Sequence, residues 1–368
     1  MHSYYMKMAI ELAKKGRYTT GPNPRVGCII VKNNSVVGRG WHRYAGQNHA
    51  EIEALKDAGS RAIGATAYVT LEPCCHTGKT GPCTDALINS GIKRVVIGMI
   101  DPNPLVAGHG VLALRQAGIS VTTNILTEES EELNPGFIKR MNHGLPYVRL
   151  KLASSLDGRT AMTNGDSKWI TGKEARREVQ LIRAQSQAVI SGIGTLLDDD
   201  PSFNIRPEEF NLNNDNLDAS IQPLRVILDS MLKTPANAKI FESGSKPLII
   251  CSCDPEDRPD LKHKAEIIQL PTKNNRIDLK RVLHILAERH CNEVLVESGA
   301  TLAGSFLAEG LVDQLKLFVA PVFMGTATKA LFNWDIARFE DRENLKITSI
   351  TPVGHDWLIT ALPEINMN

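Results

Sequence analysis

The feature that most constrains the fold is a set of metal-ligand side chains from separate places in the first part of the chain. His49 lies two residues before Glu51, Cys74 follows Pro73, and eight residues separate Cys74 from Cys83. A catalytic zinc needs three protein ligands and one open coordination position for water. If these side chains hold one metal, the fold must bring residue 49 close to residues 74 and 83.

The residue types in this set predict a particular chemistry. One imidazole and two thiolates favour zinc or another soft metal, and zinc lowers the pKa of its bound water to about 7. Release of an amine as ammonia also needs a group that takes a proton from water and delivers it to nitrogen, and Glu51 suits that role. The order His-x-Glu, Pro-Cys and Cys is the signature of zinc deaminases, although their cysteines are only two residues apart. We therefore predict hydrolytic deamination, with His49, Cys74 and Cys83 as zinc ligands and Glu51 as the catalytic group.

Local structure around the ligands can also be predicted. Residues 49 and 51 can border one site in the first turn of a helix, so we expect a helix to begin at about His49. Cys74 follows Pro73, which favours a helix N-terminus or a tight turn at this point. Backbone N–H groups at such an end would stabilise a thiolate.

Other assignments of the same residues stay open. Cys75 and His76 are alternative ligands next to Cys74. Together with Cys74 and Cys83 they would make a purely structural zinc site in a non-enzymatic scaffold, although this leaves the His-Ala-Glu segment unexplained. His42 is either a substrate-side or a structural histidine.

The hydrophobic pattern predicts two α/β domains. An amphipathic helix with Met6, Ile10 and Ala13 inward comes first, followed by a hairpin of strands at 26–31 and 36–41. Helices and strands then alternate to about residue 126, which predicts a three-layer α/β domain with a mostly parallel sheet. The Pro- and Gly-containing segment 134–146 marks a boundary, so we predict domains at 1–145 and 146–368. Strand patterns of the second half are at 188–193, 224–229, 247–251, 293–297 and 314–320.

Composition excludes several classes of protein. The formal net charge of the 368 residues is +1, so no strong field attracts nucleic acid or an anionic membrane. No apolar run approaches the ~20 residues of a membrane helix. The seven cysteines are an odd number in a long chain, which favours a reducing cytoplasm over a disulfide framework.

Three segments of the first half resemble one enzyme family. LEPCCHTGKTGPC (71–83), with its long insertion between the cysteines, TGPNPRVG (20–27) and DPNPLVAGHG (101–110) are similar to the bifunctional deaminase–reductases of riboflavin biosynthesis. The resemblance implies a cytidine-deaminase-like first domain. It also implies substrate contacts at Asn23, His76, Lys79 and Asn103. Lys79 would meet a phosphate, or it is simply a solvated lysine.

The second half resembles the reductase domain of the same family. Its Gly-rich turns at 190–195 and 297–305 are weak nucleotide signals by themselves. LKLASSLDGRTAM (150–162), the segment 167–206 and the segment 296–321 look like this domain, which implies a dihydrofolate-reductase-like fold and NADPH as cofactor. The implied NADPH contacts are Ala153, Trp169, Thr195, Asp199, Ser230, Gly299, Ala300, Thr301, Leu302, Ala303, Gly304 and Ser305. The implied substrate contacts are Ser167, Arg183, Phe203, Arg206 and Glu297.

The resemblance implies two reactions in one chain. The first domain would deaminate 2,5-diamino-6-(5-phosphoribosylamino)pyrimidin-4-one with zinc, and the second would use NADPH to reduce the ribosyl chain of the product to ribityl. Lys151, Asp199 and Glu297 are candidates for the proton donor or polarising charge of the reduction. We expect a phosphorylated pyrimidine as partner, no nucleic acid, no membrane, and a homo-oligomer. The alternative is a nucleic-acid or nucleoside deaminase with an appended binding domain, and the neutral charge opposes it.

Overall fold

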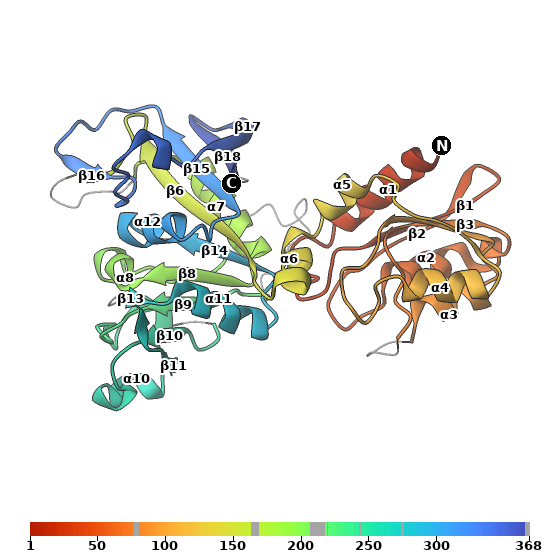
Figure 1. Ribbon diagram of the computed structural model, residues 1–368, viewed down its shortest axis with the longest axis horizontal. Helices are drawn as coiled ribbons and strands as arrows, with labels where there is room; N and C mark the ends of the chain where they lie inside the picture. The colour runs from red at the N-terminus through yellow and green to blue at the C-terminus, as the bar shows by residue number, and fades with distance from the viewer. Residues whose placement is uncertain are drawn as a thin grey trace. The chain divides into compact units, whose positions relative to one another are not determined.

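In the computed structural model, the described residues are 1–76, 81–162, 169–206, 218, 220–242, 244–273 and 276–364. They form two compact units, one of Met1–Leu145 and one that begins at Pro146 (Figure 1). Each unit has its own sheet and its own hydrophobic core.

The first unit contains a five-stranded sheet in the order β2-β1-β3-β4-β5. Its strands are β1 (Gly27–Lys32), β2 (Ser35–Trp41), β3 (Thr66–Leu71), β4 (Arg94–Met99) and β5 (Ser120–Thr122). Its helices are α1 (His2–Lys14), α2 (Ala50–Ala58), α3 (Cys83–Asn89), α4 (His109–Gln116), α5 (Thr127–Glu131) and α6 (Pro135–His143). The predicted hairpin is confirmed, and its turn is made by Asn33 and Asn34 at φ values of 50° and 60°.

Alternation of side chains along the strands divides the first unit into three layers. Ile29 and Val31 pack with α1, whereas Cys28 and Ile30 pack with α2, α3 and α4 on the opposite face. Figure 1 shows α1 and α5 on one side of the sheet and α2, α3 and α4 on the other. The predicted three-layer arrangement is confirmed, as is the inward face of the first helix.

The carboxyl edge of the first sheet positions the predicted site. β3, β4 and β5 are parallel, and β1 is antiparallel to both β2 and β3. Leu71 at the end of β3 pairs with Met99 at the end of β4. The loops that carry Cys74 and Asn103 therefore leave the sheet side by side.

The second unit is built on a nine-stranded sheet in the order β11-β10-β9-β8-β14-β6-β15-β18-β17, of which the first seven strands are parallel. Its strands are β6 (Tyr147–Ser155), β8 (Ala188–Gly192), β9 (Leu224–Leu228), β10 (Leu248–Cys251), β11 (Glu266–Gln269), β14 (Glu293–Glu297), β15 (Gln314–Ala320), β17 (Leu345–Val353) and β18 (Asp356–Pro363). The short strands are β7 (Arg159–Met162) paired with β16 (Thr328–Ala330), and β12 (Thr272–Lys273) paired with β13 (Arg276–Ile277). The helices are α7 (Lys173–Gln185), α8 (Ile193–Asp199), α10 (Pro259–Lys262), α11 (Leu279–Glu288) and α12 (Ala300–Ala308).

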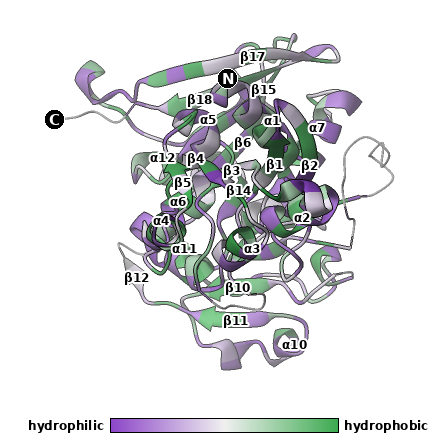
Figure 2. Ribbon diagram, turned by 90° about the vertical axis from the view of Figure 1, so that its right-hand side faces the viewer, coloured by the Kyte–Doolittle hydropathy of each residue, from purple (hydrophilic) through white to green (hydrophobic). Residues whose placement is uncertain are grey.

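The central strands of this sheet are short apolar runs because both faces are covered. All residues of β10 and β14 are buried, and β10 is drawn in the hydrophobic colour in Figure 2. The five strand patterns predicted for the second half are confirmed as β8, β9, β10, β14 and β15. Among the described residues, no helix combines the length and apolarity that a membrane crossing requires.

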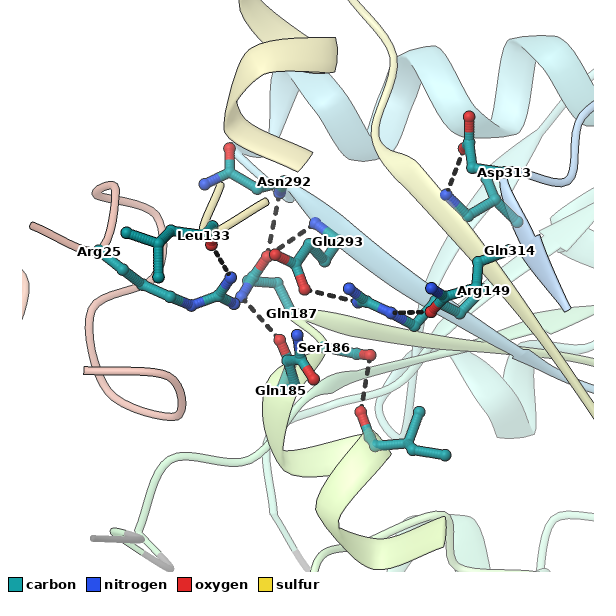
Figure 3. Close-up of polar contacts among 12 residues, drawn as sticks. Arg25, Leu133, Arg149, Gln185, Ser186, Gln187, Asn292, Glu293, Asp313 and Gln314 are labelled. Carbon is teal, nitrogen blue, oxygen red and sulfur yellow. Dashed lines mark hydrogen bonds and ion pairs between the residues drawn. The ribbon is translucent and has the colours of Figure 1, made fainter. Parts of the chain in front are cut away.

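A buried polar network joins the amino ends of four strands in the second unit (Figure 3). Arg149 of β6 binds Glu293 of β14 at 2.5 Å and Gln314 of β15 at 3.1 Å. The side-chain oxygen of Gln187, which precedes β8, accepts from the backbone N–H groups of Asn292 and Glu293 at 3.1 and 2.8 Å. These bonds fix the strand register at the edge opposite to the predicted cofactor residues.

Candidate active sites

Three predicted metal ligands converge in the first unit. His49 is the N-cap residue of α2, Cys74 follows β3, and Cys83 is the first residue of α3. His49 Nδ1 lies 3.5 Å from Cys74 Sγ and 3.3 Å from Cys83 Sγ, and the three ligand atoms all lie within 4.8 Å of one another. A tetrahedral zinc with bonds of about 2.3 Å to sulfur and 2.0 Å to nitrogen places such atoms about 3.5 Å apart. The three side chains therefore fit a zinc ion.

The prediction for the segment around Cys74 is partly wrong. Cys74 lies in an irregular loop, and the helix N-terminus at this site belongs to α3. The backbone N–H of Cys83, at the start of α3, donates to Cys74 Sγ at 3.4 Å. The expected support of a thiolate by a helix end is therefore present, but the helix is the one that carries the second cysteine. The helix predicted at about His49 is confirmed.

The ligand residues shift one another's pKa values. The hydrogen bond with Cys83 is the main cause that lowers the pKa of Cys74 to about 4, and His49 lowers it further. The same contact, together with burial, raises the pKa of Cys83 above its ordinary value. The hydrogen bond to Cys74 raises the pKa of His49. Protein contacts thus stabilise one thiolate, whereas the second requires a cation such as a divalent metal.

Glu51 lies beside this group without belonging to it. It is in the first turn of α2, and its residue is 3% exposed. Burial is the main cause that raises the pKa of Glu51 to about 7, and the nearby Cys74 charge raises it further. A carboxyl group with such a pKa can both accept and donate a proton at neutral pH.

Cys75 and His76 do not join the ligands. In the described part of the chain, the only cluster of His, Cys and carboxylate groups with metal-ligand spacing is His49, Cys74 and Cys83. His76 is exposed, and burial raises the pKa of Cys75. A four-residue structural zinc site therefore has no support. The predicted contact Lys79 lies outside the described residues.

Asn23 is oriented by the buried residue His42. His42 Nδ1 lies 3.0 Å from the carbonyl oxygen of Asn48, and because a carbonyl only accepts, this nitrogen carries the proton. Burial lowers the pKa of His42, which favours a neutral ring whose Nε2 accepts from Asn23 Nδ2 at 3.1 Å. This bond uses the amide nitrogen of Asn23, so its oxygen remains a hydrogen-bond acceptor. His42 in turn is in edge-to-face contact with the predicted ligand His49, with ring centroids 5.4 Å apart.

In the second unit, predicted cofactor residues gather along the carboxyl ends of adjacent strands. Thr195 lies in α8 after β8, Ser230 follows β9, and Gly299 caps α12 after β14. The backbone N–H of Gly299 donates to Thr195 Oγ1 at 3.1 Å. A Cβ at Gly194 would meet no described atom within 4 Å, and one at Gly299 would meet its nearest at 3.8 Å. This edge, with the N-terminus of α12, fits the phosphates of a dinucleotide.

The predicted segment from Ala300 to Ser305 forms the start of α12. Ala300, Thr301 and Leu302 are on its first turn. Ala303 is fully buried, and a Cβ at Gly304 would lie 2.3 Å from the Asn333 carbonyl oxygen, so both of these residues pack against the protein.

The remaining predicted cofactor residues are more dispersed. Ala153 lies in the carboxyl half of β6, and Asp199 ends α8. Trp169 is 68% exposed and stacks on the guanidinium of Arg176 at 4.5 Å. The predicted substrate contact Ser167 lies outside the described residues.

A buried ion pair connects the predicted substrate residues. Arg183 of α7 binds Glu297 at the end of β14 with two hydrogen bonds, of 2.5 and 3.0 Å. Arg183 also donates to the Asn204 carbonyl at 3.1 Å, and its guanidinium lies 5.7 Å from the ring of Phe203. Phe203 has a φ of 55°, a strained conformation for this residue type.

Lys151 completes this charged cluster. It pairs in register with Glu297 across β6 and β14. Burial lowers the pKa of Lys151, against the effect of Glu297 and Asp199. Burial would raise the pKa of Glu297, but Arg183, Lys151 and Arg206 outweigh it, and this pKa is lowered. The structure thus brings together predicted residues from four separate parts of the chain.

Comparison with known proteins covers both units. The model of the RibD C-terminal domain matches residues 146–359, and that of the cytidine and deoxycytidylate deaminase zinc-binding region matches residues 1–99. Riboflavin biosynthesis protein RibD of Escherichia coli K12 is 44% identical over 358 residues, which are 96% of this chain and 97% of that protein. The chain belongs to the RibD family. The RibD protein of Bacillus amyloliquefaciens is also 44% identical, over 99% of this chain and 97% of its own length.

Solved RibD structures agree. Acinetobacter baumannii RibD (form 1) has a TM-score of 0.91 and 44% identity, with 99% of each chain covered. The deaminase/reductase of Thermotoga maritima has a TM-score of 0.86 and 35% identity, with 99% of each chain covered. The cytidine-deaminase-like and dihydrofolate-reductase-like folds are confirmed.

As a RibD enzyme, the protein is a bifunctional deaminase and reductase of riboflavin biosynthesis, with a zinc-binding deaminase domain and an NADPH-dependent reductase domain. The alternative of a nucleic-acid deaminase with an appended binding domain is wrong, because the second unit matches the RibD reductase domain over nearly its whole length.

Two buried carboxylates beside the predicted metal ligands were missed by the sequence prediction. Glu72 is 3% and Asp101 is 7% exposed. Burial raises the pKa of Asp101 to about 6. The available signal was position, since each acidic residue follows the end of a buried strand at the same edge of the sheet.

Proposed function

We propose that residues 1–145 deaminate 2,5-diamino-6-(5-phosphoribosylamino)pyrimidin-4-one and that residues 146–368 reduce the ribosyl chain of the product to ribityl. The observation that carries this proposal is the convergence of His49, Cys74 and Cys83 beside the buried carboxyl group of Glu51. The description of the Thermotoga maritima relative as a diaminohydroxyphosphoribosylaminopyrimidine deaminase and 5-amino-6-(5-phosphoribosylamino)uracil reductase supports both substrates.

In the deamination, His49, Cys74 and Cys83 hold zinc, which when bound supplies Lewis-acid activation of water. Glu51 takes the proton from water as it adds to the ring carbon that bears the amine. Glu51 delivers this proton to the adjacent ring nitrogen and then moves the remaining hydroxyl proton to the departing amine, so that a ring carbonyl and ammonia are produced. The amide oxygen of Asn23, left open by the bond to His42, accepts from an N–H of the pyrimidine.

Three further residues of the first unit are proposed substrate contacts. Asn103 binds the pyrimidine nucleotide from the loop after β4, while His76 and Lys79 bind its phosphate. His76 is exposed in the loop that carries Cys74. This exposure supports the role, because a bound phosphate remains partly solvated.

In the reduction, NADPH when bound supplies the hydride. Its proposed contacts are Ala153, Trp169, Thr195, Asp199, Ser230 and the segment Gly299 to Ser305. The proposed substrate contacts are Ser167, Arg183, Phe203, Arg206 and Glu297. Lys151 supplies a positive charge that polarises the group being reduced: it pairs in register with Glu297, and Glu297 and Asp199 favour its protonated form against the effect of burial.

The experiment uses the full-length enzyme in two assays. Zinc content is measured together with ammonia release from the diaminopyrimidinone, and NADPH oxidation is measured with the deaminated product. We expect zinc-dependent ammonia release and NADPH oxidation only with the deaminated compound. Ammonia release from metal-free enzyme would contradict the first assignment, and NADPH oxidation with the undeaminated compound at the same rate would contradict the second.

A homo-oligomer is also proposed. The outermost strand β17 is a nine-residue edge, and its side chains include Ile347 and Ile350, which are 56% and 55% exposed. Long apolar edges are normally covered in the native assembly. Sedimentation of the full-length protein at micromolar concentration tests this, and a monomer would contradict it.

We propose the cytoplasm as the location and a phosphorylated pyrimidine, without nucleic acid, as the partner. None of the seven cysteines forms a disulfide, and a reducing compartment keeps cysteines in this state. The net charge of +1 offers no field for a polyanion. Cell fractionation tests the location.

A further inference from the structure

Glu72 is a buried carboxylate directly after β3, two residues before the metal ligand Cys74. Its Oε2 accepts from the backbone N–H groups of Asp101 and Gly108 at 3.2 and 2.9 Å. Its Oε1 accepts from the N–H of Val111 at 3.0 Å. One side chain therefore holds both ends of the segment 101–111.

The same segment packs closely against the loop that carries Cys74. A Cβ at Gly110 would lie 2.1 Å from the Pro73 carbonyl oxygen and 3.2 Å from Glu72 Cγ, so only glycine allows this approach. Glu72 also donates its own N–H to the carbonyl of Met99 at the end of β4. The position of the segment relative to Cys74 is thus set by Glu72 and its neighbours.

Within the segment, a second carboxylate orients Asn103. Asp101 Oδ1 accepts from the backbone N–H of Asn103 at 2.8 Å. The amide oxygen of Asn103 accepts from the N–H of Leu105 at 3.1 Å, so its Nδ2 group is the part left to donate. Asn103 therefore presents a donor, whereas Asn23 presents an acceptor.

We propose that Glu72 is a positioning residue of the deaminase, which presents the Asn103 amide to the pyrimidine substrate by holding the backbone of Asp101, Gly108 and Val111. This inference rests on the proposed function, in which Asn103 contacts the substrate. The hydrogen bonds of the Glu72 carboxylate go to backbone N–H groups and not to a ligand atom of the metal site. Its effect is carried by three N–H groups that a glutamine could not satisfy together, because an amide NH₂ cannot accept a hydrogen bond.

The test measures KM, kcat and zinc content of the full-length Glu72→Gln enzyme with the diaminopyrimidinone. We expect KM to rise about tenfold, kcat to change about threefold or less, and one zinc per chain to remain. The matched control is Asp85→Asn, an exposed carboxylate on α3, which should leave all three values unchanged. Loss of zinc in parallel with activity would show that Glu72 only holds the loop that carries the metal ligand Cys74, and would overturn the proposal.

A double-mutant cycle tests whether the effect passes through Asn103. Asn103→Ala should raise KM about tenfold, and the double variant should be little worse than either single variant. Independent action, seen as a roughly hundredfold rise in the double variant, would overturn the proposal. A normal KM for Asn103→Ala would instead place the failure in the proposed function, because Asn103 would then not contact the substrate.

Hydrogen exchange supplies a readout that does not depend on activity. In Glu72→Gln, the amides of Asp101, Gly108 and Val111 should exchange faster while those of α1 keep their wild-type rates. If this variant does not fold, Glu72→Asp carries the same test, since the shorter carboxylate cannot reach all three N–H groups. An unchanged KM and unchanged exchange in Glu72→Asp would contradict the positioning role.

Discussion

Glu51 and Glu297 are both buried carboxyl groups at the carboxyl edges of their sheets, yet their pKa values shift in opposite directions. Burial and the charge of Cys74 raise the pKa of Glu51 to about 7. Burial has the same effect on Glu297, but Arg183 and Lys151 outweigh it. Neighbouring charge therefore decides what a buried carboxyl group does: Glu51 can move protons, whereas Glu297 stays ionised as a fixed charge.

The largest expected effect comes from replacing one of the proposed zinc ligands beside Glu51. Cys83→Ser should lose zinc and reduce ammonia release to background, because a hydroxyl is a poor replacement for a thiolate ligand. NADPH oxidation with the deaminated substrate should be unchanged. Zinc analysis and the two assays check this, with Cys75→Ser as the matched control that keeps both. Equal zinc loss from Cys75→Ser would restore the four-ligand alternative.

The second prediction removes the proton carrier and keeps the metal. Glu51→Gln should lower kcat for ammonia release by about 10³, within the range of general acid–base catalysis, because an amide cannot shuttle the proton. Zinc content and NADPH oxidation should stay at wild-type levels. Normal deamination by this variant, measured at pH 7, would remove Glu51 from the mechanism.

The third prediction removes the main cation beside Glu297, so that burial should raise its pKa as it raises the pKa of Glu51. Arg183→Ala leaves a buried carboxylate without its main partner, which should cost about 3–5 kcal/mol in the free energy of unfolding and reduce NADPH oxidation. In the wild type the pKa of Glu297 is lowered, so its stabilisation is present above the unfolded pKa of about 4.3 and is lost as pH falls. In the variant the pKa should be raised, and stability should fall as pH rises above that value.

The measurement for Arg183→Ala is urea unfolding across acid pH, together with the reductase assay. Arg149→Ala is the matched control, because it breaks the buried pair with Glu293 at the opposite edge of the same strands. It should lose similar stability while the folded enzyme keeps its KM for the deaminated substrate. If both variants change KM equally, the edge that carries Glu297 has no special role in binding.

The smallest expected effect concerns Lys151, the cation that faces Glu297. Because burial lowers its pKa, the alkaline limb of the reductase pH profile should lie below the ordinary lysine value of about 10.4. Lys151→Arg keeps the positive charge but does not lose its proton in this range, so the limb should move upward. A limb that stays in place in this variant assigns the titration to another group.

The two units differ in how far their sequence predicted them. Strand alternation from Gly27 to Lys32 and the helical face of Met6, Ile10 and Ala13 follow from local periodicity, so the layers were predictable. Gly304 shows the limit: a glycine in a predicted phosphate turn packs on Asn333, which is distant in sequence. Local pattern identifies residue types, but it does not say which partner a side chain meets.

The sequence by itself determined the zinc chemistry, because His49, Glu51, Cys74 and Cys83 occur in the order of a zinc deaminase signature. One imidazole and two thiolates also favour zinc or another soft metal. The sequence also determined the two α/β units through the period of their apolar residues. Only the tertiary structure decided that the helix end beside Cys74 belongs to α3, that Glu72 holds the Asn103 loop, and that the pKa of Glu297 is lowered while that of Glu51 is raised to about 7. These properties depend on groups that the parallel strands bring to one edge, and distance in space, unlike order in the chain, sets their hydrogen bonds and pKa values.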